Sequence, residues 1–200
     1  MAILSDTAIC IRCWDFSETS QTVSLLTKEH GLIRGLAKGS KRDKGSFSGG
    51  FDPLTRGHIV ARMKPNSDLA TFTEWQLEHV WWSTRNSLPV NKATIYMADL
   101  VFRMITDQDP HTNIYESLAE ALNRMDDGHD IDWPVLRFQW ALLVETGYQP
   151  TLTTNQEDEP VVAFSSKIGG VVEDTGEIDR VRVRKETIEV LRLLQDQGPM

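Results

Sequence analysis

The first 75 residues alternate between apolar and polar positions in short runs that turn residues separate, a pattern that predicts β-strands. In the third run Ile33, Gly35 and Ala37 share one side, and small residues there permit close backbone approach or tight curvature. Five short strands in this space are typical of a five-stranded OB-type barrel. The expected strands cover residues 7–14, 20–27, 32–37, 54–63 and 69–75.

After about Leu77 the period lengthens to about 3.6, which predicts helices and an α+β fold overall. Asp132 is a candidate N-cap for the third helix, with Pro134 in its first turn and Gly147 at its end. We therefore expect an OB-fold domain at 1–77, a helical domain at 78–150 and a C-terminal segment at 151–200. The apolar stripes are Met97, Leu100, Val101 and Met104; Ile114, Leu118, Leu122 and Met125; Leu136, Trp140 and Leu143; and Ile188, Leu191 and Leu194.

The chain has two cysteines, Cys10 and Cys13, whose spacing looks like half of a zinc site. Residues three apart in a strand point to opposite faces, so we expect the two thiols not to converge but to be small buried apolar groups. Without a disulfide framework, a secretory leader or an apolar run of about 20 residues, the expected location is the cytoplasm, away from membranes.

Charge is unevenly distributed along a chain whose net charge is −8. Residues 28–64 contain nine basic and three acidic residues, a net +6, which leaves −14 for the remainder. A basic island in an acidic protein is the pattern expected when one face meets phosphates and another meets different partners.

Residues 38–50 combine four glycines with four cations, which predicts a mobile, solvent-exposed loop. Cations on such a loop suit an irregular phosphate backbone, although a solvated hairpin loop has the same composition. The aromatics close enough in sequence to stack on bases are Trp14, Phe47 and Phe51, and Phe51 is equally suited to the core. At least two of Trp75, Trp81 and Trp82 are expected to be buried in a seam between barrel and helices.

No constellation for covalent chemistry is visible. The five histidines lack the i, i+4 pairing of a metal site, and the sequence has neither a G-x-S-x-G nor a Walker motif. The acidic residues Asp126, Asp127, Asp130 and Asp132 lack the glycine and terminal glutamate of a calcium loop. We therefore expect a binding protein that is not an enzyme, with no catalytic residue, metal or cofactor.

Several ordered motifs resemble the RecO family of DNA repair proteins. Residues 8–12 (AICIR) and 15–20 (DFSETS) resemble the family's opening, and residues 23–31 (VSLLTKEHG) with 34–42 (RGLAKGSKR) are similar to its strand, turn and basic segment. Residues 143–150 (LVETGYQP) look like its helix end. Many relatives carry a four-cysteine zinc site in the segment corresponding to 151–176, where this chain has no cysteine, so a zinc-less subdomain held by helix and loop packing is expected.

The resemblance implies a recombination mediator that binds single-stranded DNA, promotes annealing and helps to load a recombinase with a RecR-like protein and single-strand-binding protein, in association with the nucleoid. The alternative is an adaptor of the same fold without significant direct DNA binding. By motif match Arg34, Lys38, Lys41 and Arg42 are the expected phosphate contacts. Lys44 and Arg56 are added on charge and position, and Arg85 is a weaker addition.

Overall fold

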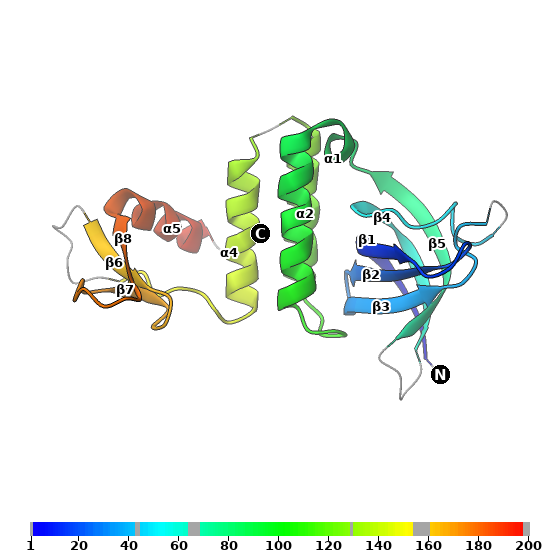
Figure 1. Ribbon diagram of the computed structural model, residues 1–200, viewed down its shortest axis with the longest axis horizontal. Coiled ribbons are helices and arrows are strands. Elements are labelled where there is room, and N and C mark those ends of the chain that lie inside the picture. The colour runs from blue at the N-terminus through cyan, green and yellow to red at the C-terminus, as the bar shows by residue number, and fades with distance from the viewer. Residues whose placement is uncertain (1, 43–44, 64–68, 129, 154–160, 198–200) are drawn as a thin grey trace. The chain divides into compact units, whose positions relative to one another are not determined.

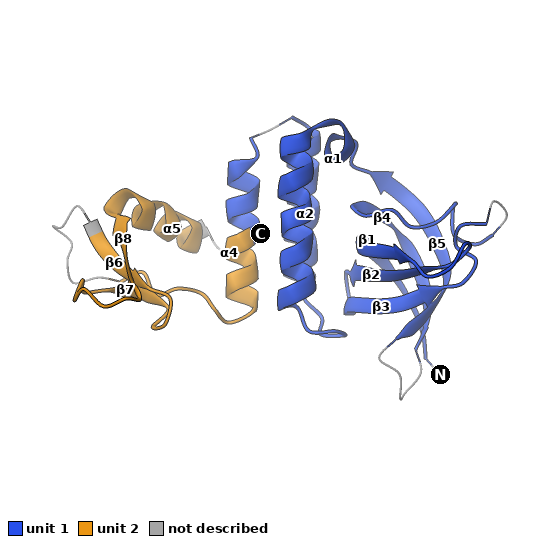
Figure 2. Ribbon diagram, viewed as in Figure 1, with its two compact units in different colours: residues 1–138 blue, residues 139–200 orange. Residues whose placement is uncertain are grey.

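The computed structural model describes residues 2–42, 45–63, 69–128, 130–153 and 161–197. The chain forms two compact units, residues 1–138 and 139–200 (Figure 2). Helix α4 runs from the first unit into the second.

The first unit contains a closed five-stranded barrel with strand order β1-β2-β3-β5-β4 (Figure 1), which confirms the predicted OB-type fold. Its pairings are antiparallel except between β3 and β5. The first strand begins five residues earlier than predicted and the last ends five residues later. The strands are β1 (Ala2–Asp15), β2 (Gln21–Thr27), β3 (Gly31–Ala37), β4 (Thr55–Met63) and β5 (Ala70–Val80).

Gly35 lies where the barrel closes, opposite Ala70 in the parallel pairing of β3 with β5. A Cβ at this position would lie 2.8 Å from the Ala70 carbonyl oxygen and 2.8 Å from a ring carbon of Phe72. The expectation of a close backbone approach along this strand is therefore confirmed at Gly35.

The prediction that Cys10 and Cys13 point to opposite faces is wrong. The pairing of β1 with β2 shifts between Cys10 and Arg12, so a β-bulge breaks the alternation and both thiols lie against the barrel core. Burial raises the pKa of the Cys10 thiol, and the hydrogen bond from Cys10 lowers the pKa of Cys13. Cys10 is buried as predicted, while Cys13 is only partly buried.

Helices α1 to α4 follow the barrel. The predicted stripe on α4 is mostly wrong, because of its three residues only Trp140 is buried, and Phe138 and Leu142 are buried instead. The stripes on α3 and α2 agree better. All four residues of the stripe on α3 are buried, and so are Met97 and Val101 on α2.

Trp75 and Trp81 are buried and Trp82 is exposed, so the expected burial of two of the three tryptophans is confirmed. Trp75, however, lies in the barrel core and not in a seam with the helices. The Trp81 indole donates to Asn123 Oδ1 on α3 at 2.7 Å. No described helix is long and apolar enough to cross a membrane. The helices are α1 (Ser83–Asn86), α2 (Leu88–Met104), α3 (Thr112–Asp126) and α4 (Asp132–Glu145).

Helix α4 ends as predicted, but Asp132 is its first residue and not its N-cap. Pro134 lies in its first turn, and Gly147 follows it with a φ of 78°. The N–H of Tyr148 donates to the Leu143 carbonyl at 2.8 Å, which caps a helix end that glycine favours.

The second unit contains an antiparallel sheet that the sequence did not predict, with strand order β7-β6-β8. Ser165 on β6 hydrogen-bonds to Asp179, Asp179 also pairs with Arg180 at 3.6 Å, and Arg182 on β8 pairs with Asp174 at 2.7 Å. These hydrogen bonds hold the pKa of Asp174 and of Asp179 below the ordinary aspartate value. The acidic stretch at 155–160, whose composition favours a loop, lies outside the described residues. The elements are β6 (Val161–Ser165), β7 (Gly170–Val172), β8 (Arg180–Arg184) and α5 (Lys185–Gln197).

Candidate nucleic-acid interface

The segment between β3 and β4 is fastened to the barrel at both ends. Near its start, the N–H of Gly39 donates to Ser20 Oγ and the N–H of Lys41 donates to the Thr19 carbonyl, each at 3.1 Å. Near its end, the Gln21 side chain binds both the N–H of Phe51, at 3.0 Å, and its carbonyl, at 3.1 Å. The described part of this segment is therefore held against the β1–β2 turn.

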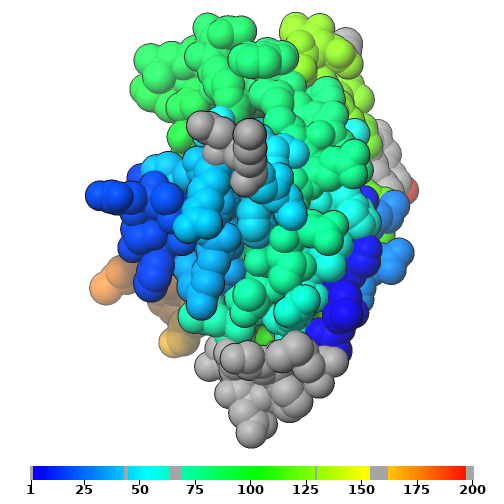
Figure 3. Space-filling model, turned by 90° about the vertical axis from the view of Figure 1, so that its right-hand side faces the viewer, coloured from blue at the N-terminus to red at the C-terminus, as the bar shows by residue number. Residues whose placement is uncertain are grey.

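Three of the predicted DNA contacts, which we name the loop cations, are exposed on this segment: Lys38, Lys41 and Arg42. Lys41 Nζ pairs with Asp15 at 2.9 Å. Within the described chain, Lys38 and Arg42 make no ion pair. Figure 3 shows the β1–β2 turn in blue and this segment in light blue on one face of the molecule. Lys44 lies outside the described residues.

Arg34 lies on the outer surface of the barrel, where helix α2 packs against β1. Its Nε pairs with Asp107 at 3.0 Å, and its guanidinium lies 4.5 Å from the centre of the Phe102 ring. Arg12 approaches the same ring at 4.2 Å and pairs with Asp99. Arg34 therefore contacts the helix that follows the barrel, and it must leave Asp107 before it can bind a phosphate with its full charge.

Arg56 and Arg85 also have intramolecular partners. Arg56 lies 3.9 Å from Glu78 and 6.0 Å from the centre of the Trp81 ring. It neighbours Tyr115, whose pKa burial raises to about 12. The Arg85 guanidinium donates to Asp52 Oδ2 and to the Pro53 carbonyl, each at 3.1 Å, and so joins α1 to the end of the β3–β4 segment.

Of the three aromatics predicted to stack on bases, two are buried and one is exposed. Phe47 and Phe51 are buried in the barrel core, so the prediction of an exposed loop is wrong at these rings. Trp14 is half-exposed and meets Phe102 edge to face, with ring centres 6.2 Å apart. The sequence reading missed Phe16, which is 66% exposed in the β1–β2 turn. Phe16 follows the last residue of β1, Asp15, so strand alternation does not reach it and its exposure appears only in the folded chain.

Other kinds of site find less support. Among the described residues, no group of three or more His, Cys, Asp or Glu side chains could hold a metal ion; His129 lies outside them. Two members of the acidic group bind backbone N–H groups: Asp126 accepts from Ser83 and Asp130 from Asp132. These contacts agree with helix-end roles for the acids.

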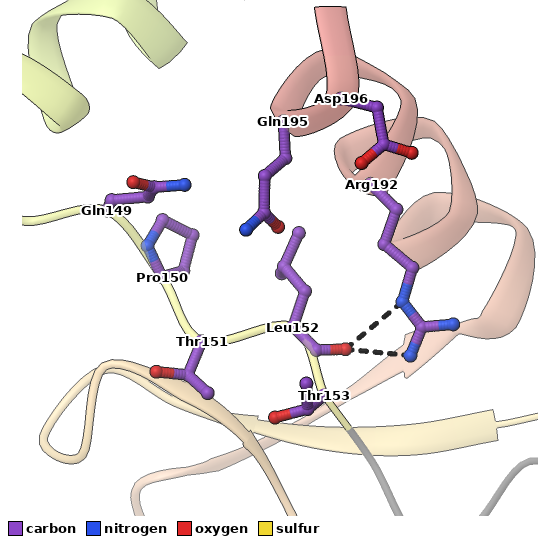
Figure 4. A pocket seen from close by; sticks show the side chains of 8 residues that line it. All are labelled: Gln149, Pro150, Thr151, Leu152, Thr153, Arg192, Gln195 and Asp196. Carbon is purple, nitrogen blue, oxygen red and sulfur yellow. Dashed lines mark hydrogen bonds between the residues drawn. The ribbon is translucent and has the colours of Figure 1, made fainter. Parts of the chain in front are cut away.

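The second unit has a pocket of about 470 Å³ between the residues after α4 and helix α5 (Figure 4). The guanidinium of Arg192 donates from Nε and Nη2 to the Leu152 carbonyl, at 3.2 and 2.7 Å. Arg192 thus fastens the chain before β6 to α5. This structural role accounts for an arginine in the pocket wall. The lining residues are Gln149, Pro150, Thr151, Leu152, Thr153, Arg192, Gln195 and Asp196.

Comparisons with known proteins agree on one family. Residues 1–81 match the family model "Recombination protein O N terminal", and residues 85–199 match "Recombination protein O C terminal". The chain is similar to the DNA repair protein RecO of Rhodopirellula baltica, with 35% identity over 72% of this chain and 53% of the relative. It is also similar to the DNA repair protein RecO of Bacillus subtilis, with 29% identity over 72% of this chain and 56% of the relative. The RecO protein of Dehalococcoides mccartyi is 26% identical over 96% of this chain and 78% of its own length. The chain thus spans a little over half of the first and second of these relatives.

Proposed function

Because this chain belongs to the RecO family of DNA repair proteins, we propose that it is a recombination mediator that holds single-stranded DNA on its barrel. The loop cations are the contacts that we assign to the phosphates. Neither catalytic side chains nor a cofactor is needed for this role.

The exposure of the loop cations is the observation that carries the proposal. Lys38 and Arg42 project from a segment that the barrel holds at both ends, so their charges are available to a phosphate backbone. Lysine and arginine that neutralise phosphates release condensed counterions, which favours binding even when the rest of the protein is acidic. The net charge of −8 therefore does not oppose a local contact of this kind.

Annealing follows from the same contacts. Two complementary strands repel each other through their phosphates, and cations that neutralise one strand lower that repulsion while its bases stay free to pair. We further propose that the acidic remainder of the chain contacts a RecR-like protein and single-strand-binding protein, through which the protein assists recombinase loading in the nucleoid. Lys44, Arg34 and Arg56 stay additional candidates for DNA contact. Arg85, the weakest of the predicted contacts, needs a separate test because its guanidinium already has intramolecular partners.

Replacing Lys38, Lys41 and Arg42 together with alanine is expected to weaken single-strand binding and to flatten its salt dependence. Each phosphate contact contributes about 0.7 to the slope of log affinity against log salt concentration, so three lost contacts reduce the slope by about 2. Fluorescence anisotropy of a labelled oligonucleotide across a salt series measures both quantities. An unchanged slope would remove the loop cations from the interface.

Arg85→Ala is a single-charge comparison for that experiment, since it removes one cation that is not among the loop cations. Its guanidinium binds Asp52 and the Pro53 carbonyl, so we expect the salt slope to stay unchanged while the melting temperature falls by a few degrees. A slope reduced by about 0.7, with an unchanged melting temperature, would instead place Arg85 on a phosphate.

A protein adaptor of the same fold is the second candidate, favoured by the excess of acidic residues outside residues 28–64. This adaptor predicts no binding of single-stranded DNA even at low salt, where electrostatic contacts are strongest. The anisotropy series on the unaltered protein therefore separates the two candidates before any variant is made.

A further inference from the structure

The β1–β2 turn presents an aromatic ring beside the loop cations. We propose that Phe16 is the platform on which an unpaired base of the bound strand stacks, an inference that rests on the proposed single-strand binding. Phe16 is 66% exposed, so its ring is open to contact with a base. Aromatic platforms next to cationic grooves are the means by which proteins hold single strands regardless of sequence.

Hydrogen bonds fasten the backbone of the turn that carries Phe16. The N–H of Phe16 donates to the Ser20 carbonyl at 2.8 Å, and the N–H of Ser17 donates to the same oxygen at 3.2 Å. Ser20 is buried, and its hydroxyl accepts from the N–H of Gly39 in the neighbouring segment. Because the backbone at Phe16 is already held, a base that stacks on the ring has only the side chain to order.

The same contacts hold the platform and the cations together. Lys41 donates its N–H to Thr19 in the turn, and its ammonium pairs with Asp15, the residue before Phe16. The Lys41 ammonium therefore lies beside Asp15, the residue next to Phe16. In every nucleotide the base and the phosphate are joined through one sugar, so a contact with one brings the other near. A phosphate that takes the place of the Asp15 carboxylate on Lys41 would bring its own base to the neighbourhood of Phe16.

The other aromatics of the described barrel are less suited to this role. Phe47, Phe51, Phe72 and Trp75 are buried in the core. Trp14 is exposed over 47% of its surface, but Phe102 packs against its ring and Arg12 lies 5.9 Å from its centre. Phe16 is thus the ring of this face that a base reaches without displacing a described side chain.

Stacking on Phe16 gives the interface a preference for single strands. In a duplex each base already stacks on its neighbours, and freeing one costs a few kcal/mol. The loop cations contact phosphates that both forms possess, so they favour single and double strands alike. Phe16 therefore contributes to single-strand binding and adds nothing for the duplex.

An abasic oligonucleotide separates stacking from phosphate contact, because it keeps the phosphates and lacks the bases. Anisotropy is measured for the full chain with three labelled probes of equal length: a mixed-sequence single strand, its abasic analogue and the duplex. We expect Phe16→Ala to weaken binding of the mixed-sequence strand by about 5- to 20-fold and to leave the other two probes and the salt slope unchanged. Phe16→Trp retains the affinity, Phe16→Leu loses it as alanine does, and Trp82→Ala, which removes another exposed aromatic, has no effect.

The outcomes distinguish failure of this inference from failure of the proposed function. If Phe16→Ala weakens all three probes equally, or none of them, while the loop-cation variant loses affinity, Phe16 is no stacking platform and the proposed function stands. If the unaltered protein binds no probe at low salt, the proposed function fails and the inference fails with it. Circular dichroism of each variant confirms that the barrel remains folded.

Discussion

Phe51→Ala is expected to lower the free energy of unfolding of the barrel by about 3 to 5 kcal/mol, the usual cost of truncating a buried phenylalanine. The ring is 4% exposed and lies 4.8 Å from Trp75, 5.9 Å from Phe47 and 6.0 Å from Phe72 between ring centres. Alanine leaves a cavity among these aromatics, which the surrounding strands close only in part. Urea unfolding followed by tryptophan fluorescence measures the loss, with Trp75 as a reporter next to the altered site.

This substitution also decides between the two roles that the sequence left open for Phe51. As a core residue it should affect stability first, and Phe51→Leu, which keeps most of the apolar volume, should cost less than about 1.5 kcal/mol. A stacking residue would show the reverse, with unchanged stability and a loss of single-strand affinity. Because the Phe51 ring is buried, we expect the core role. Since Gln21 binds both the N–H and the carbonyl of Phe51, we also expect the alanine variant to hold the β3–β4 segment less firmly.

The barrel could be predicted from the sequence because its strands alternate regularly and turns separate them. Ile33 and Ala37 face the core as the pattern requires, and Gly35 shows the close approach that small residues suggested. What the pattern could not supply was the bulge between Cys10 and Arg12. One inserted residue moves every later side chain of the strand to the opposite face of the sheet, and the local amino-acid composition gives no sign of the insertion.

The candidate site was only partly predictable for a different reason. Sequence identifies a cation but not the distant carboxylate that it meets, and Arg34, Arg56 and Arg85 all meet one in the fold. The partners Asp107 and Asp52 lie 73 and 33 residues away along the chain from their arginines. Lys38 and Arg42 differ because no described residue pairs with them, and exposure of this kind becomes visible only once the chain is folded.

The sheet of the second unit escaped prediction because its strands are only three to five residues long. Strand β7 has three residues, and β8 alternates arginine with valine on a mostly exposed surface. Strand β8 is stabilised by its pairing with β6 and by contacts such as that of Arg182 with Asp174. The sequence does not reveal these contacts. The buried residues Val162, Ile188 and Leu194 then give the unit its own apolar core.

Gly35→Val is expected to destabilise the barrel by about 3 kcal/mol, because an added side chain meets backbone where β3 and β5 close the sheet. A Cβ 2.8 Å from the Ala70 carbonyl oxygen is closer than real contacts allow, and the Phe72 ring blocks the other direction. Relief requires the two strands to separate at their short parallel pairing, which involves three residue pairs.

Gly45→Val provides the matched control, since a Cβ there meets nothing nearer than 3.9 Å. We expect this change to alter the free energy of unfolding by less than about 0.5 kcal/mol, as surface substitutions usually do. Thermal melting of both variants measures the difference, and hydrogen exchange locates it: amides of β3 and β5 should lose protection in Gly35→Val, while those paired between β1 and β4 keep more of theirs. Equal melting temperatures for the two variants would show that the β3–β5 junction yields easily, and that closure of the barrel does not depend on a glycine at this position.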